Sequence, residues 1–140
     1  MMHRTLWLTC LLFLGLLLPA CSVNTAQSTS PMATPSTPGM AHTVYFWLKD
    51  GLSAEELASF EAGMKSLQAA PSVRRAFVGA PAATPSREVV DNSFDYSLVL
   101  WFDDVAGHDA YQVSPTHLKF VEDHEAKFDV VKVFDNMLLN

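Results

Sequence analysis

Apolar residues after position 40 follow two periods, one typical of strands and one typical of helices. His42–Leu48 (HTVYFWL) and Phe94–Phe102 (FDYSLVLWF) are rich in β-branched and aromatic residues, so they predict strands. Val73–Gly79 and Phe128–Asp135 predict two further strands. Residues 81–93 combine prolines with mixed charge and predict a loop.

The segment after the first strand has the spacing of an amphipathic helix. Its apolar positions lie three and four residues apart, at Leu57, Phe60, Met64 and Leu67. Ser53 and Glu56 have the arrangement of a capping box at its start. Pro71 follows the last apolar position, so the helix should end before it.

A second helical region precedes the last strand. Asp103-Asp104 lies at its start, where a carboxylate caps a helix, and we favour this capping role over cation binding. Ser114-Pro115 interrupts the region, which then resumes to about Lys127. The order βαββαβ predicts an α+β fold of the ferredoxin-like type, an antiparallel sheet with both helices on one face.

Alternation within the strands predicts which side chains share a face of this sheet. The face that should meet the helices carries His42, Val44, Phe46 and Leu48 from the first strand, and Phe94, Tyr96, Leu98, Leu100 and Phe102 from the third. The opposite face, which we call the open face, carries Tyr45, Trp47, Val99 and Trp101. A sheet face in water normally alternates to polar residues, so these side chains require a cover.

A large apolar patch on a small domain is typical of an interface. We therefore expect a two-fold homodimer through the open face, with a second copy of the same sheet as its cover. Two alternatives remain, which are scattered surface aromatics and a cover formed by the tail Met137–Leu139.

The amino-terminal segment has the pattern of an export signal. Leu6–Leu18 is almost wholly apolar but shorter than the ~20 residues that span a bilayer, which favours a signal peptide over residues 1–20. Leu18-Pro19-Ala20-Cys21 resembles the bacterial lipobox, so we expect lipidation of Cys21. Ser22 then favours the outer membrane, and the alternative is ordinary cleavage after Ala20.

Residues 21–40 are rich in Ser, Thr and Pro and have no charged side chain, so they predict a disordered tether to a domain over residues 41–140. The chain has 15 acidic and 9 basic residues without a basic cluster, which excludes a nucleic-acid partner. Its cysteines, Cys10 and Cys21, both precede the domain. The spacing of the histidines predicts no metal site, and we expect no cofactor.

Four segments together resemble the stress-responsive A/B barrel domain (Dabb) family. They are HTVYFWLKDG, SFDYSLVLWFDD, DAYQVSPTHLKFVE and KVFD, within about residues 42–135. The resemblance implies a ferredoxin-like protomer and a dimer whose two sheets form an α/β barrel. Most members have no assigned activity, so the resemblance leaves the function open.

A plant branch of this family resembles a polyketide cyclase, in which a Tyr and a His act as acid and base between helices and sheet. Matching the motif implies these roles for Tyr111 and His117, with His42 as the family's strand-opening His. Ser114 departs from the family, which usually has His before the Pro. The interruption at Pro115 would let Tyr111 and His117 turn toward one cavity.

Two classes of function follow. The first is a lipid-anchored envelope protein that acts under stress and binds a partner or a small apolar ligand, with contacts from His42, Val44, Phe46, Leu98 and Leu100. The second is a cofactor-free acid–base enzyme that uses Tyr111 and His117. A structural alternative is that these two side chains only brace the interrupted helix.

Overall fold

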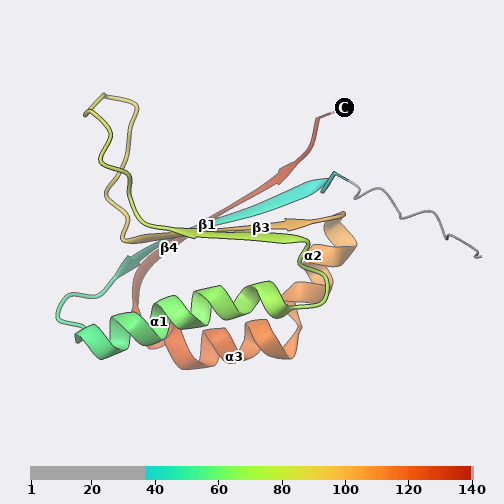
Figure 1. Ribbon diagram of the computed structural model, residues 1–140, viewed down its shortest axis with the longest axis horizontal. Helices are drawn as coiled ribbons and strands as arrows, with labels where there is room; N and C mark the ends of the chain where they lie inside the picture. Colours follow the sequence, from blue (N-terminus) through green and yellow to red (C-terminus); the bar gives the residue numbers. More distant parts are fainter. Residues whose placement is uncertain (1–36, 140) are drawn as a thin grey trace, which may run out of the picture. The chain divides into compact units, whose positions relative to one another are not determined.

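The computed structural model describes residues 37–139, which are built on a four-stranded antiparallel sheet in the order β2-β3-β1-β4 (Figure 1). The strands are β1 Met40–Leu48, β2 Arg75–Gly79, β3 Tyr96–Phe102 and β4 Phe128–Met137. The helices are α1 Ala54–Ser66, α2 Val105–Gln112 and α3 Pro115–His124, with 3₁₀ turns at Leu67–Ala69 and Glu125–Lys127. All three helices lie on one side of the sheet (Figure 1), which confirms the predicted ferredoxin-like α+β class.

The predicted signal peptide, Cys21 and the tether up to residue 36 lie outside the described residues. Within residues 37–139, no helix has both the length and the apolar content that crossing a bilayer requires. β1 begins at Met40, before the expected His42, because Met40 is buried and pairs with residues of both neighbouring strands.

The first helix begins where its capping box predicts. The Ser53 backbone N–H donates to Glu56 Oε2 over 2.8 Å, and the Glu56 N–H donates to Ser53 Oγ over 3.2 Å. The apolar stripe faces the sheet, since Phe60, Met64 and Leu67 are almost fully buried. Phe60 lies at the centre of the core, with its ring against those of Phe46 and Phe120.

Ser114-Pro115 ends one helix and also starts the next. Asp104 caps α2 by accepting from the Gly107 N–H at 2.8 Å, as the acidic pair predicted. Ser114 is the N-cap of α3, since its hydroxyl accepts from the His117 N–H at 3.2 Å, and Pro115 occupies the first turn. The predicted interruption is therefore a capped junction between two separate helices.

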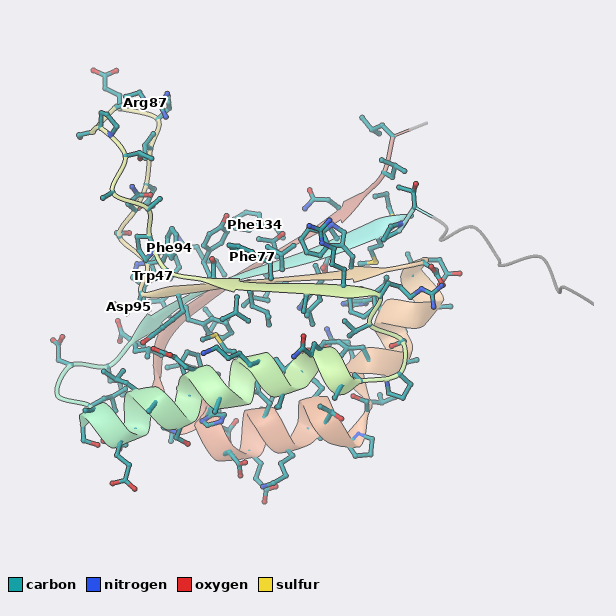
Figure 2. All side chains as sticks on the ribbon, viewed as in Figure 1. Trp47, Phe77, Arg87, Phe94, Asp95 and Phe134 are labelled. Carbon is teal, nitrogen blue, oxygen red and sulfur yellow. The ribbon has the colours of Figure 1, made fainter. Side chains whose placement is uncertain are left out.

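One residue lies on the face of the sheet opposite to the one predicted. Phe94 was predicted to face the helices, but its ring lies 4.8 Å from that of Tyr45, on the open face (Figure 2). β3 begins only at Tyr96. Asp95 breaks the alternation before it, because its N–H donates to the Phe46 carbonyl and its carboxylate accepts from the Leu48 N–H.

Candidate functional site

A cavity of about 150 Å³ lies between the helix-facing side of the sheet and α3. Its apolar wall comes from side chains of β1, β3, β4 and α3. Four polar residues, His42, Tyr111, Gln112 and His117, also line it, and we call these four the polar end. A cavity of roughly this size in a protein core accommodates a benzene ring.

The predicted ligand contacts meet this cavity with one exception. His42, Val44, Phe46 and Leu98 line it. Leu100 does not, because it is fully buried in the core. The lining also includes Val131 and Val133 of the edge strand β4, which keep 39% and 48% of their surface exposed. The cavity therefore has a side that the helices leave open to solvent.

Tyr111 of α2 lines this cavity. Its side chain is 1% exposed, with the ring 4.7 Å from that of His117 and 6.1 Å from that of His42. The hydroxyl makes no hydrogen bond with any other described residue. Its oxygen is not fully buried, since no fully buried side-chain nitrogen or oxygen of the described residues lacks a partner. Burial raises the pKa of this phenol, so the group remains a neutral donor at physiological pH.

The junction at Ser114 holds His117 in a defined tautomer. His117 Nδ1 lies 2.9 Å from the Gln112 carbonyl oxygen, which can only accept, so Nδ1 carries the proton. In the neutral ring, Nε2 then keeps a lone pair. The expectation that the interrupted helix brings Tyr111 and His117 to one cavity agrees with this geometry, whereas their catalytic role stays a prediction.

A second cluster of polar side chains consists of His42, His108 and Asp135, and the sequence did not predict it. His42 Nδ1 donates to Asp135 Oδ1 over 2.7 Å, and the His42 and His108 rings lie 5.1 Å apart. Burial lowers the pKa of His42, while the hydrogen bond to Asp135 opposes that shift. The pairing of β1 with β4 places His42 opposite Asp135, and this register cannot be read from either strand alone.

The open face is a separate candidate surface. Besides the predicted residues, it carries Phe77, Phe94 and Phe134, and Figure 2 shows all three above the sheet. Phe77 and Phe134 are 54% and 52% exposed. The tail does not cover them, because Met137, Leu138 and Leu139 are themselves 54%, 54% and 92% exposed. Within residues 37–139, this apolar face therefore lacks a cover.

The open face also carries cations above its tryptophans. The Arg75 guanidinium lies 5.0 Å from the centre of the Trp101 ring, and Lys132 Nζ lies 5.0 Å from that of Trp47. The loop between β2 and β3 rises beside this face, with Arg87 near its tip (Figure 2). Together with Lys132 and Phe134, part of the loop borders a hollow of about 470 Å³.

Comparison with known proteins gives one family and a set of similar folds. Residues 40–138 match the Stress responsive A/B Barrel Domain family, Dabb. A Dabb family protein with a ferredoxin-like fold from Mesorhizobium loti is 23% identical, with a TM-score of 0.59 over 74% of this chain and 100% of that chain. No protein of curated function matches the sequence significantly.

Two further solved structures have the same fold. A dimeric ferredoxin-like protein of unknown function from Thermobifida fusca is 20% identical, with a TM-score of 0.60 over 72% of this chain and 92% of that chain. The hydroxynitrile lyase from Passiflora edulis is 22% identical, with a TM-score of 0.62 over 74% of this chain and 96% of that chain. At these identities the likeness shows the fold alone.

Proposed function

The chain belongs to the stress-responsive A/B barrel domain (Dabb) family, and from this premise we propose that its domain binds a small, mostly apolar molecule in the cavity. The bound molecule has a hydrogen-bond acceptor, such as a carbonyl oxygen, that meets the Tyr111 hydroxyl. The observation that supports this most directly is Tyr111, which lines the cavity and whose hydroxyl makes no hydrogen bond with another described residue.

The energetics of the site favour such a ligand. The Tyr111 hydroxyl makes no hydrogen bond to another described residue, so an acceptor that reaches it gains one hydrogen bond, a net contribution of about 0.5–1.5 kcal/mol. The apolar wall adds roughly 25 cal/mol for each Å² of ligand surface that it removes from water. The small volume restricts the buried part of the ligand to about one ring or a short alkyl chain.

Acetophenone and ethylbenzene test this proposal, because they have nearly the same shape and differ in one carbonyl group. We expect the protein to bind acetophenone more tightly than ethylbenzene by about two- to ten-fold, the effect of one net hydrogen bond. Tyr111→Phe should remove this preference while both compounds still bind, as measured by NMR titration.

Tyr45→Phe is the matched control, since Tyr45 lies on the open face and should leave the preference unchanged. Melting temperatures of both variants separate a lost contact from a loosened fold. An equal preference in Tyr111→Phe and the wild type would contradict the role of this hydroxyl. Failure of both compounds to bind the wild type would contradict the ligand site itself.

A cofactor-free acid–base enzyme is the second candidate, and the tautomer of His117 favours it. The proton on Nδ1 is engaged by the Gln112 carbonyl, which leaves Nε2 as a base on a ring whose centre lies 4.7 Å from that of Tyr111. The Passiflora edulis relative, a hydroxynitrile lyase, is an enzyme on the same fold. Ser114 replaces the His that the family usually has before the Pro, so a hydroxyl stands there in place of an imidazole.

Deuterium exchange at the methyl carbon of acetophenone in heavy water would reveal this activity. If His117 Nε2 takes a proton from the bound ketone, His117→Ala should slow the exchange by about 10²–10⁴-fold. The rate should be unchanged in His124→Gln, because His124 does not line the cavity. If acetophenone exchanges no faster with the wild-type protein than in buffer alone, the enzyme proposal is contradicted. The ligand-binding proposal would still stand.

We also propose that two chains pair through their open faces to form a dimeric α/β barrel. Tyr45, Trp47, Val99 and Trp101 lie at the centre of this face, with Phe77 and Phe134 on the outer strands. Burying such a patch is favourable in proportion to its apolar area. The dimeric ferredoxin-like protein from Thermobifida fusca supports this arrangement by analogy of fold.

Finally, we propose that the domain is held at the bacterial envelope by lipid on Cys21. The support comes from the sequence, where an apolar run of signal-peptide length leads directly to Leu18-Pro19-Ala20-Cys21. The residues after Ser22 then provide a tether. The cavity and the open face would thus act outside the cytoplasm, at the outer membrane.

A further inference from the structure

Two histidines and one aspartate from three different elements meet beside the polar end of the cavity. His42 of β1 lies opposite Asp135 of β4, and α2 brings His108 close to both. His108 Nε2 is 4.0 Å from Asp135 Oδ1, the oxygen that accepts from His42 at 2.7 Å. Each residue offers a ligand atom within 4.8 Å of the others. The geometry points to a binding site for one divalent transition-metal ion.

The donor set selects the class of ion. Two imidazoles and one carboxylate suit Zn²⁺ and its first-row neighbours, whereas Mg²⁺ and Ca²⁺ prefer oxygen ligands alone. Metal–ligand bonds of about 2.0–2.2 Å place neighbouring ligand atoms roughly 3–3.5 Å apart. The distances from Asp135 Oδ1 to His42 Nδ1 and to His108 Nε2, 2.7 Å and 4.0 Å, lie on either side of this range, so small side-chain rotations suffice to close the site.

His108 is already oriented in the way that metal-binding histidines usually are. Its Nδ1 donates to Asp109 Oδ1 over 3.2 Å, so the neutral ring directs its Nε2 lone pair away from Asp109. A carboxylate that holds the second nitrogen of a ligand histidine is a recurring feature of metal sites. The low pKa that burial gives His42 agrees with this, because a neutral imidazole is the form that binds a metal.

Two hydrogen bonds must give way when the ion binds. The proton that His42 Nδ1 donates to Asp135 moves to Nε2 of the same neutral ring, and Gln112 Nε2 moves from His108 Nε2, which it now contacts at 2.9 Å. We therefore expect an affinity below that of a closed structural zinc site. Three protein ligands leave at least one coordination position open, and solvent reaches it because the Asp135 side chain is 45% exposed.

This site does not depend on the proposed ligand, since the ligand preference is tested at Tyr111, which is not one of the three residues. The spacing of the histidines predicted no metal site, because spacing along the chain does not place Asp135 beside them. The contact between His42 and Asp135 joins residues 93 positions apart. Only the register of β1 on β4 brings them together.

Calorimetric titration of Zn²⁺ into the metal-free, tag-free full chain tests the inference. We expect one ion per chain, bound at least ten-fold more weakly by Asp135→Asn and by His108→Gln. Asp135→Asn keeps the side-chain shape at a half-exposed position, so the fold should persist, as circular dichroism will show. Asp129→Asn, an exposed position on the same strand, is the matched control and should bind like the wild type.

X-ray absorption of the zinc-loaded wild type gives a readout that needs no variant. Two imidazole ligands with additional oxygen ligands are the expected result. Sulfur ligands would place the zinc on a cysteine and overturn the inference. Equal affinity in all four proteins, which would show adventitious zinc only, or no binding to the wild type would overturn it as well. None of these outcomes alters the acetophenone preference, so the two proposals fail separately.

Discussion

Phe134→Lys should convert the protein from a dimer to a monomer. Phe134 lies on β4, is 52% exposed in the single chain and would become buried between the two sheets. A lysine there would place an ammonium group in an apolar interface, and two-fold symmetry would do so twice. Arg75 and Lys132 already give this face positive charge, to which the new cation would add.

The expected size of this effect follows from the cost of an uncompensated buried charge. About 3–5 kcal/mol raises the dissociation constant by at least about a hundred-fold. Sedimentation equilibrium of the purified full chain in density-matched detergent measures it. Leu118→Lys is the matched control, since Leu118 is 57% exposed on α3, on the helical side of the sheet.

Two results would contradict the dimer. If the wild type sediments as a monomer at tens of micromolar, above the dissociation constant of an ordinary specific dimer, the open face has another cover. If Phe134→Lys sediments as the same dimer as the wild type, the chains pair through a different surface. An unchanged melting temperature of the monomeric variant would show that the domain tolerates an exposed open face.

Cys21→Ala should release the protein from the membrane fraction almost completely. Each buried methylene of an acyl chain contributes about 0.8 kcal/mol, and stable anchoring requires more than one chain. Without the acceptor sulfur no acyl chain can be attached, so the chain should remain unprocessed or become soluble. Phase separation in Triton X-114 and the mass of the mature amino terminus measure the two outcomes.

Ser22→Asp is the informative control for this prediction. It leaves Cys21 available for lipid, so the protein should stay in the detergent phase. If Ser22 sets the outer-membrane address, as expected, the variant should move to the inner-membrane fraction. A wild-type chain that partitions to the aqueous phase with an unmodified Cys21 would exclude the lipid anchor and favour cleavage after Ala20.

Elements with strong local signals could be predicted from the sequence. The α1 helix begins at the predicted capping box, and the Ser114-Pro115 junction lies where the helical pattern is interrupted. Both depend on hydrogen bonds between residues three positions apart, so a short stretch of sequence is enough to predict where each helix begins. The meeting of Tyr111 and His117 followed from the same junction.

Features that depend on strand pairing could not be predicted. Phe94 changes face because Asp95 pairs with the end of β1, a contact across 47 residues. Asp135 joins His42 through the register of β1 and β4. Leu100 is on the helix-facing side of β3, as predicted, but it is fully buried by other core side chains and does not line the cavity. In each case the deciding neighbour is distant in the sequence.

Ser114 connects the backbones of two residues of the polar end, Tyr111 and His117. Its N–H donates to the Tyr111 carbonyl over 2.9 Å, and its hydroxyl accepts from the His117 N–H over 3.2 Å. The spacing between phenol and imidazole therefore depends in part on a short helix junction at one small residue outside the apolar core. A substitution at Ser114 that removes its hydroxyl would keep the backbone bond and lose the cap, so it would act on this spacing without touching the sheet.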